Sequence, residues 1–427
     1  MSWKTVVVSL LIGLFVMPAF AAAEKIEIEY WQYYYESKKL LVDDLIKEFE
    51  AENPDITVKH QTFPYDSFIQ KVATTVPAGR GPDVVTLYYG WFPTWISSGY
   101  LQPLPEDKIS YEEIENEFFP MVQSAKFGGK YYGIPTAVRT LALFWNKDLF
   151  AKAGLDPEKP PTNWDEFVEY AKATTERDDD GKLQVAGYAF NVLGQDHHWF
   201  RECLLRQNNA PTMSEDGKQV LWNSTPEGYE AWQWFVDLVD THKVGELSFF
   251  PDDPFAPFSI GRAAMLVDGS FRVAKLKDAM DKGLNAGVAP LPAHKSKATF
   301  ASYWVHGITR NAEGEKLDAA VKFLKFMTTK QTMKAWLERV GELPARKALI
   351  EDPEIVEDPI IGPFVEQLPY AYSTFFIDEK ANRQAIQDAV EAVVLKDEDP
   401  KAALDAAVET VNAVRAEFFE KHPGLVE

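Results

Sequence analysis

The feature that most constrains the fold is an alternation of strand-like and helix-like segments near the start of the chain. Residues 25–30 alternate apolar and charged side chains, which is typical of a half-buried strand. Residues 41–49 then repeat apolar side chains at helical spacing, and the turn residues 53–55 end this helix. Strand-like runs follow at 56–58 and 83–87. Strand, helix and strand in this order predict βαβ units and an α/β fold.

Later segments continue the pattern. Thr162 and Asn163 are both good N-caps, and Glu166 lies three residues past Asn163, at capping-box spacing. No long Gly/Ser linker divides the chain, so we expect two lobes joined by crossing strands. Apolar faces at helical spacing predict further helices at 229–239, 317–327, 333–340, 386–393 and 404–418.

The first 23 residues have the pattern of a secretory signal peptide. Lys4 gives a short basic start, and an uncharged apolar run follows at 5–20. Small residues then offer cleavage points near Ala21 to Ala23. An uncleaved membrane anchor is the alternative, but the run is short for a membrane span. We therefore expect residues 1–23 to be removed on export.

The number and position of cysteines bear on the cellular compartment that we expect for this protein. Cys203 is the only cysteine, and it lies far from the predicted cleavage point. No lipoprotein cysteine is therefore present at that point, and we expect a freely soluble protein in a periplasm. A single cysteine also excludes an internal disulfide.

The length of the chain indicates how many domains it can form, and its charge limits the kinds of partner that it can bind. A chain of 427 residues can form two domains, each with its own core. It carries 65 acidic against 44 basic residues, a formal net charge of −21. This charge repels phosphate backbones, so we expect no nucleic-acid partner. It weakly favours a neutral or cationic solute over an anion, although the local charge of a cleft can override that preference.

Two aromatic runs mark a candidate binding region. One covers residues 30–35 and the other covers residues 88–95, and both lie at or just past the carboxyl ends of predicted strands. Ligands of open α/β sheets bind in the crevice outside those ends. Flat aromatic faces suit the C–H faces of a sugar ring, while nearby polar groups bond its hydroxyls. Any single ring in these runs can equally serve the core.

The possible metal-binding residues of the sequence do not have the spacing that a metal site requires, and common catalytic motifs are missing. His197 and His198 are adjacent, so they point in different directions, and no second ligand pair follows at a usual spacing. The acidic turn at 178–181 lacks the acid that a calcium loop needs at its twelfth position, where Gly187 stands. The motifs G-x-S-x-G, H-E-x-x-H and C-x-x-C are absent. We expect no metal, no cofactor and no enzymatic activity.

Four segments in order resemble the family 1 extracellular solute-binding proteins of the maltose-binding type. Residues 129–172 resemble the central signature of that family, and the other pieces lie at 41–58, 81–104 and 261–327. Trp145 stands where the family more usually has Tyr, and His306-Gly307 stands where members often have a Gly-Gly pair. The resemblance covers nearly the whole mature chain.

The resemblance implies a type II periplasmic binding fold. Two α/β lobes, each a sheet flanked by helices, would hold a ligand cleft between them and close on it. We expect chain crossings near Arg139-Thr140, near Val305-Gly307 and around Pro359 to Pro369. The implied N-terminal lobe is 24–139 plus 306–360, and the implied C-terminal lobe is 140–305 plus 361–427.

The resemblance also implies a set of cleft residues. Aromatic rings would stack on the solute, and Gln32, Asp268 and Arg272 would bond its hydroxyls. The alternative is that Arg272 is a surface residue and Asp268 a helix cap. The full candidate set is Trp31, Gln32, Tyr35, Tyr89, Trp91, Trp199, Asp268, Gly269, Arg272, Trp304, His306, Tyr370 and Tyr372.

The implied function is that of a monomeric capture subunit of an ABC importer. It would bind a mono- or oligosaccharide and deliver it to the membrane permease subunits. A binding protein for another polar solute, such as a polyol, is the near alternative. A secreted carbohydrate-active enzyme with two facing carboxylates and a cell-envelope adhesion module are further alternatives.

Overall fold

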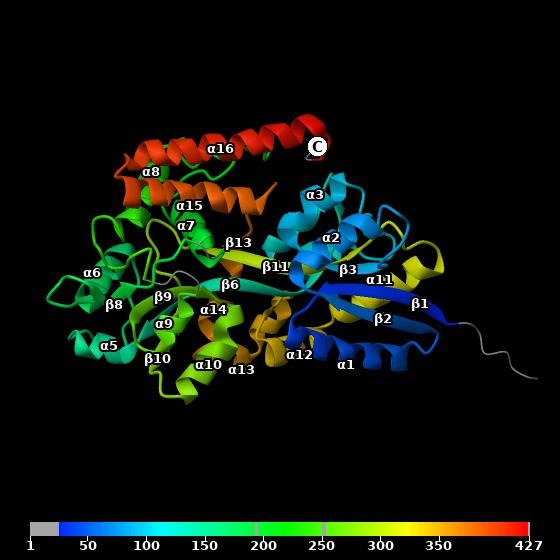
Figure 1. The fold of residues 1–427 in the computed structure, drawn as a ribbon. Coiled ribbons are helices and arrows are strands. Elements are labelled where there is room, and N and C mark those ends of the chain that lie inside the picture. Colours follow the sequence, from blue (N-terminus) through cyan, green and yellow to red (C-terminus); the bar gives the residue numbers. More distant parts are fainter. Residues whose placement is uncertain (1–24, 193–194, 250–252, 426–427) are drawn as a thin grey trace, which may run out of the picture.

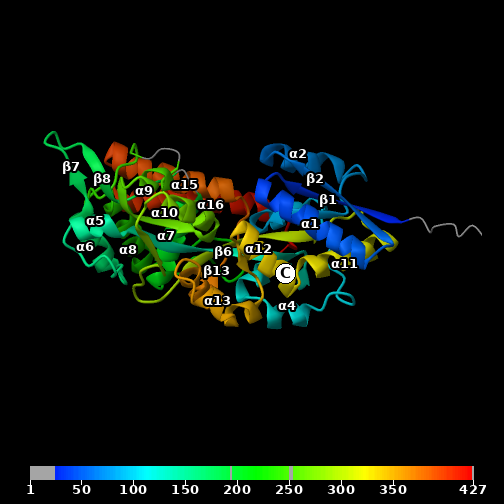
Figure 2. The ribbon, with the colours of Figure 1, turned by 90° about the horizontal axis from the view of Figure 1, so that it is seen from below.

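The computed structural model describes residues 25–192, 195–249 and 253–425. The predicted signal peptide, 1–23, lies outside the described residues. The described chain is a mixed α/β structure whose main sheet has the strand order β2-β1-β3-β11-β6-β9-β8-β7. Figures 1 and 2 show two helix-covered groups of strands side by side, and we call them the N-terminal and C-terminal lobes.

The N-terminal lobe begins with the three predicted strands. β1 (Ile26–Tyr33) pairs in parallel with both β2 (Ile56–Phe63) and β3 (Val84–Tyr88). β3 is buried along its whole length, as expected for a parallel strand covered on both faces. The predicted helix at 41–49 lies within α1. The helices of this lobe are α1 (Glu36–Glu52), α2 (Tyr65–Thr75), α3 (Phe92–Ser97), α4 (Tyr111–Glu117), α11 (Glu315–Met327) and α12 (Lys330–Val340).

The C-terminal lobe contains the other end of the sheet. β9 (Ala263–Gly269) pairs with β8 (Leu183–Tyr188), which pairs with β7 (Glu176–Arg177). In Figure 1, α15 and α16 lie together along the top of this lobe. Its helices are α5 (Lys147–Lys152), α6 (Trp164–Thr174), α7 (Gln195–Gln207), α8 (Pro226–Asp237), α9 (Phe255–Ser259), α10 (Val273–Asp281), α15 (Glu379–Lys396) and α16 (Pro400–Lys421).

Two long antiparallel strands belong to both lobes. β6 (Ile134–Asn146) pairs with β11 (Thr299–Ile308) up to Thr140, and from Leu141 onward it pairs with β9. From Trp304 to its end, β11 pairs with β3 of the N-terminal lobe. Both strands therefore run from one lobe to the other, and two of the predicted crossing segments lie on them (Figure 1).

The other elements of the described chain are short. In the third predicted crossing, around Pro359 to Pro369, α14 packs on β6 and β10, and the Thr140 hydroxyl donates to the Phe364 carbonyl at 3.2 Å. The short elements are β4 (Lys126–Phe127), β5 (Lys130–Tyr131), β10 (Ala286–Ala289), β12 (Leu343–Pro344), β13 (Ala371–Tyr372), α13 (Pro353–Val356), α14 (Gly362–Glu366), η1 (Tyr89–Trp91), η2 (Pro120–Ala125), η3 (Ser270–Arg272), η4 (Lys347–Glu351) and η5 (Leu368–Tyr370).

The predicted cap of α6 is present. The Asn163 side chain accepts from the backbone N–H of Glu166 at 2.9 Å. The Glu166 carboxylate reaches back to the backbone N–H of Thr162 at 2.7 Å, one residue before the N-cap. Together these bonds satisfy donors that the first turn of a helix leaves free, and they fix where α6 begins.

Candidate functional site

A cavity of about 270 Å³ lies where the two lobes meet. Tyr65 and Tyr88 line it from the N-terminal lobe, and Trp199 and Arg383 line it from α7 and α15 of the C-terminal lobe. Arg139 and Trp304 come from the two crossing strands. A solute in this cavity would therefore contact both lobes and the segments that join them.

Trp304 is the centre of an aromatic cluster on the N-terminal side of the cavity. Its ring centroid lies 4.2 Å from that of Tyr33, and 5.4 Å from that of Trp91 in an edge-to-face contact at 87°. Tyr65 lies 5.7 Å from Trp91, and Tyr88 lies 5.8 Å from Trp304. Such packing holds the rings in fixed positions, so one face can be offered to a ligand at little cost in side-chain entropy.

Trp199 forms the opposite wall. Its ring stacks on Phe300 with centroids 4.9 Å apart and an interplanar angle of 8°. The side chain is 2% exposed, and among the described residues its indole N–H has no hydrogen-bond acceptor. A buried donor without an acceptor costs free energy, so this wall has hydrogen-bonding capacity that the described residues do not use.

A buried ionic cluster lies behind the aromatic wall. Arg139 Nε donates to Glu342 Oε1 at 2.6 Å, and Lys38 Nζ lies 2.9 Å from the same oxygen. The indole of Trp336 donates to Glu342 Oε2 at 2.8 Å. Burial raises the pKa of Glu342, but the charges of Arg139 and Lys38 outweigh it and hold the pKa at about 2. Glu342 is therefore ionised at neutral pH.

Two further contacts tie the arginines of the cavity to the C-terminal lobe. The guanidinium of Arg139 lies 5.0 Å from the ring centroid of Phe271, which follows β9. Arg383 Nε lies 3.9 Å from Glu379 Oε1 on the same helix. Arg139 thus contacts both lobes through Glu342 and Phe271.

Three residues of the sequence-predicted set form this site together. Trp199 and Trp304 line the cavity, and Trp91 packs edge-on against Trp304. Tyr35 lies beside them at the N-terminus of α1, 46% exposed, with its ring 5.9 Å from Lys38 Nζ.

Trp31 and Gln32 lie inside the N-terminal lobe and do not line the cavity. The Trp31 indole packs on Phe63 and donates to Glu29 at 2.9 Å. The Gln32 amide, 1% exposed, bonds His60 at 2.8 Å. Side chains alternate along a strand, and Tyr33 shares the face of Trp31 but stands two residues nearer the carboxyl end. The last residue of β1 therefore contacts Trp304, which lines the cavity.

His306 and Tyr89 are also core residues in the structure. His306 is 3% exposed, with Nε2 2.7 Å from the Thr136 hydroxyl and Nδ1 3.2 Å from the Tyr30 hydroxyl. Burial lowers the pKa of His306 to about 3, so the imidazole is neutral. Tyr89 stacks on Tyr303 at 4.8 Å.

The remaining predicted residues lie in the C-terminal lobe outside the cavity lining. Asp268 accepts from Arg272 Nε at 2.9 Å, and Arg272 also pairs with Asp253 at 2.9 Å. Phe271 packs against Gly269, where an added Cβ would lie 2.1 Å from its ring.

Tyr370 and Tyr372 stand on the same lobe in different surroundings. The Tyr370 ring lies 5.8 Å from Lys297 Nζ near the surface. Tyr372 lies under the guanidinium of Arg206 at 3.7 Å and contacts Phe300, which in turn stacks on Trp199. Tyr372 therefore supports the wall of the cavity from behind.

Five residues around the cavity were absent from the predicted set: Tyr33, Tyr65, Tyr88, Arg139 and Arg383. Tyr33 and Tyr88 lie inside the two aromatic runs, so both runs contribute residues to the surroundings of the cavity. Arg139 lies in an expected crossing segment. Tyr65 and Arg383 sit on helices without an aromatic run, and only the folded arrangement brings them together.

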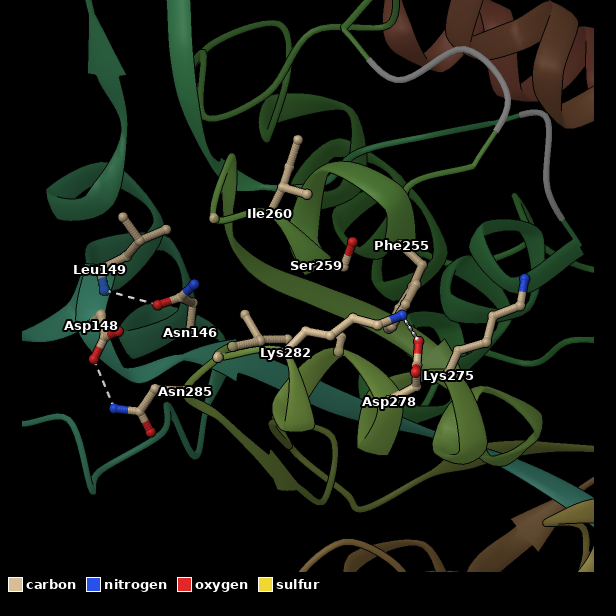
Figure 3. Close-up of a pocket in the computed structure, with 14 residues that line it drawn as sticks. Asn146, Asp148, Leu149, Phe255, Ser259, Ile260, Lys275, Asp278, Lys282 and Asn285 are labelled. Atoms are coloured by element: carbon tan, nitrogen blue, oxygen red, sulfur yellow. Dashed lines mark hydrogen bonds and ion pairs between the residues drawn. The ribbon is translucent and has the colours of Figure 1, made fainter.

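A larger pocket of about 720 Å³ opens on the C-terminal lobe (Figure 3). All of its lining comes from that lobe, from the end of β6, from α5, α9 and α10, and from the chain that leads into β10. Two pairs of its own lining residues bond each other, Asp148 with Asn285 and the exposed Lys282 with Asp278. Closure of two lobes could not enclose a solute there, so we assign the candidate site to the smaller cavity.

The described residues were also searched for metal and membrane features. They contain no group of three His, Cys, Asp or Glu side chains arranged to hold a metal ion. The side chains of His197 and His198 lie outside the described part of the structure. Among the described helices, none is both long and apolar enough to cross a bilayer.

Comparisons with known proteins agree with this architecture. Residues 36–334 match the family model of the bacterial extracellular solute-binding proteins. The galactooligosaccharide-binding protein of Bacillus subtilis is 26% identical, over 90% of this chain and 88% of its own length. The sn-glycerol-3-phosphate-binding periplasmic protein of Escherichia coli is 26% identical, over 88% of this chain and 90% of its own length.

Solved structures share the fold. The cyclic α-maltosyl-1,6-maltose binding protein of Arthrobacter globiformis superimposes with a TM-score of 0.80, covering 92% of this chain and 100% of that one at 24% identity. The predicted two-lobe α/β fold is therefore confirmed. With the family model matching well over half of the sequence, the chain belongs to the bacterial extracellular solute-binding proteins.

Proposed function

We propose that this protein captures a carbohydrate outside the cytoplasm and delivers it to an importer in the membrane. The observation that carries the proposal is the cavity between the lobes, lined by Tyr65, Tyr88, Trp199 and Trp304. Aromatic rings on two opposite walls can pack on the C–H faces of a sugar ring. Polar groups at the edges, such as Arg139, can bond its hydroxyls.

The relatives narrow the class of solute. The protein from Bacillus subtilis is named for galactooligosaccharides, and the protein from Escherichia coli for sn-glycerol 3-phosphate. A mono- or oligosaccharide is our first choice, and a polyol derivative is the second. The family consists of binding proteins, so we propose that the cleft performs no chemistry on the solute.

The two crossing strands suit a hinge mechanism. We propose that the lobes, 24–139 plus 306–360 and 140–305 plus 361–427, rotate about β6 and β11 and close over the solute. The ligand would stabilise the closed form because only that form contacts it from both sides. The permease subunits of an ABC transporter would then recognise the closed shape of a monomer.

Secretion follows from the same proposal. We propose cleavage near Ala21 to Ala23 and release into the periplasm, since no cysteine is present there for a lipid anchor. Amino-terminal sequencing of the protein isolated from its host would test this point. A mature chain that still begins at Met1 would contradict it.

A thermal-shift panel of neutral sugars, acidic sugars, polyols and amino acids tests the function. A ligand at about a hundred times its Kd adds roughly 2.7 kcal/mol of stability, which gives a clear shift in Tm. The protein should first be freed of copurified solute by unfolding and refolding. A hit among the carbohydrates supports the proposal. Hits confined to amino acids, or hydrolysis of an added sugar, would overturn it.

A further inference from the structure

The charged groups that line the cavity are all cationic. Arg139 and Arg383 face it, and no Asp or Glu belongs to the lining among the described residues. The other polar groups of the lining include the hydroxyl of Tyr65 and the indole N–H of Trp304, whereas the Tyr88 hydroxyl and the Trp199 indole N–H are buried. The cavity is therefore rich in hydrogen-bond donors and poor in acceptors. A neutral sugar can accept these bonds through its hydroxyl oxygens, but only an anionic group would also balance the positive charge of the lining.

The ionic cluster behind the cavity has an excess positive charge. Lys38 and Arg139 share the single carboxylate of Glu342, and the side chains of Lys38 and Glu342 are 2% and 4% exposed. Two cations and one anion leave one net positive charge in a poorly solvated place. A charge held there without compensation is costly, and a ligand of opposite charge would balance it.

Arg383 adds a second cation with unused bonding capacity. Its ion pair with Glu379 is 3.9 Å long, which exceeds hydrogen-bond length. The side chain is 27% exposed, so its guanidinium is open toward the cavity that it lines. A guanidinium binds planar carboxylates and phosphates in a bidentate manner, and these bonds are stronger than those to a neutral hydroxyl.

We infer that the cleft selects a carbohydrate that carries an anionic group, a carboxylate or a phosphate, held between Arg139 and Arg383. This inference rests on the proposed carbohydrate function and specifies the class of sugar. The aromatic walls take the ring, and the arginines take the anion. The net charge of −21 opposes an anionic solute at long range, so the cationic cleft provides the local attraction.

Isothermal titration of the refolded, ligand-free protein with matched pairs tests this inference. The pairs are D-glucose with D-glucuronate, D-glucose with D-glucose 6-phosphate, and glycerol with sn-glycerol 3-phosphate. At least one acidic member should bind tenfold or more tightly than its neutral parent, and added salt should reduce the difference. Comparison of glucuronate with glucose 6-phosphate shows which anion is preferred.

Variants of single arginines make the test specific. Arg383→Gln, on the partly exposed face of α15, should lose roughly tenfold in affinity for the acidic ligand and little for its neutral parent. Arg177→Gln is the matched control, because Arg177 pairs with Glu246 on the far edge of the sheet. It should bind like the wild type, and Tm values should show that both variants are folded.

Each result has a distinct meaning. Tighter binding of the acidic member, lost in Arg383→Gln, supports the inference. Equal or tighter binding of the neutral parents overturns it and leaves the carbohydrate function intact. An acidic preference that survives in Arg383→Gln also overturns it, because the selectivity would then reside elsewhere. Binding of non-carbohydrate solutes alone would remove both the inference and the function on which it rests.

Discussion

Arg139 Nε donates to Glu342 Oε1 across 2.6 Å, which joins a strand shared by both lobes to the segment after α12. The same carboxylate pairs with Lys38 of α1. The Glu342 carboxylate therefore links the crossing strand β6 with helices α1 and α12, behind the cavity. Its position makes the stability of the hinge depend on one buried anion.

Glu342→Gln should destabilise the protein strongly. The substitution keeps the shape of the side chain but leaves Lys38 and Arg139 buried without a counter-charge. Removal of one partner of a buried ion pair costs about 3–5 kcal/mol. Urea unfolding followed by circular dichroism measures the loss. Glu354→Gln is the control, since Glu354 is 85% exposed in its pair with Lys334 and should cost at most about 1 kcal/mol. Equal losses would contradict the prediction.

Trp304→Ala should weaken solute binding while Trp31→Phe should not. Truncation of a buried aromatic anchor in a binding site costs about 2 kcal/mol or more, or roughly 30-fold in Kd. Trp31 packs on Phe63 within the lobe, so its substitution should change Kd less than twofold. Titration calorimetry with the best ligand of the panel measures both values. A large effect of Trp31→Phe on Kd, with Tm unchanged, would show that Trp31 belongs to the site after all.

His306 should make folding sensitive to mild acid. Burial lowers its pKa from 6.5 to about 3, so the unfolded chain binds a proton between these values and the folded chain does not. The stabilisation is complete above pH 6.5 and is lost as the pH falls toward 3. At pH 5 the loss from this residue should be about 2 kcal/mol.

His306→Gln should flatten that pH dependence. Unfolding free energies measured between pH 7 and pH 5 should fall less steeply in this variant than in the wild type. His294→Gln, at an exposed position, is the control for the loss of a histidine elsewhere in the chain. Identical slopes in all three proteins would refute a role for His306.

Cys203 should report unfolding through its thiol. It is fully buried, and burial raises its pKa to about 12, so the reactive thiolate is scarce in the folded state. Labelling by a thiol reagent at pH 8 should proceed only as the protein opens. A bound solute should slow the labelling in proportion to its stabilisation. Rapid labelling of the folded protein would contradict the described burial.

The fold was predictable because its signals are local. Alternation marks β1, helical spacing marks α1, and the bonds of Asn163 and Glu166 begin α6 where the sequence indicates. Each of these features depends on residues a few positions apart. The order of such segments was then enough to indicate two α/β lobes.

The site was only partly predictable because it depends on distant contacts. Trp31 and Tyr33 share one face of β1 and look alike in sequence, yet Trp31 packs on Phe63 and Tyr33, at the end of the strand, packs on Trp304. His306 lies on a crossing strand, but its side chain bonds Thr136 and Tyr30 in the core. Arg383 reaches the cavity from a helix some 240 positions after Arg139, and nothing in its local sequence marks that role.

The pairing of β3 with β11 also bears on how the chain is made. Val84 lies opposite Ile308, so the N-terminal lobe lacks a central strand until more than 300 residues have been synthesised. Contacts between such distant residues form slowly, because a long loop must close first. A chain that cannot finish its first lobe early stays unfolded for longer. The shared strand thereby ties the folding of the first lobe to the synthesis of most of the chain.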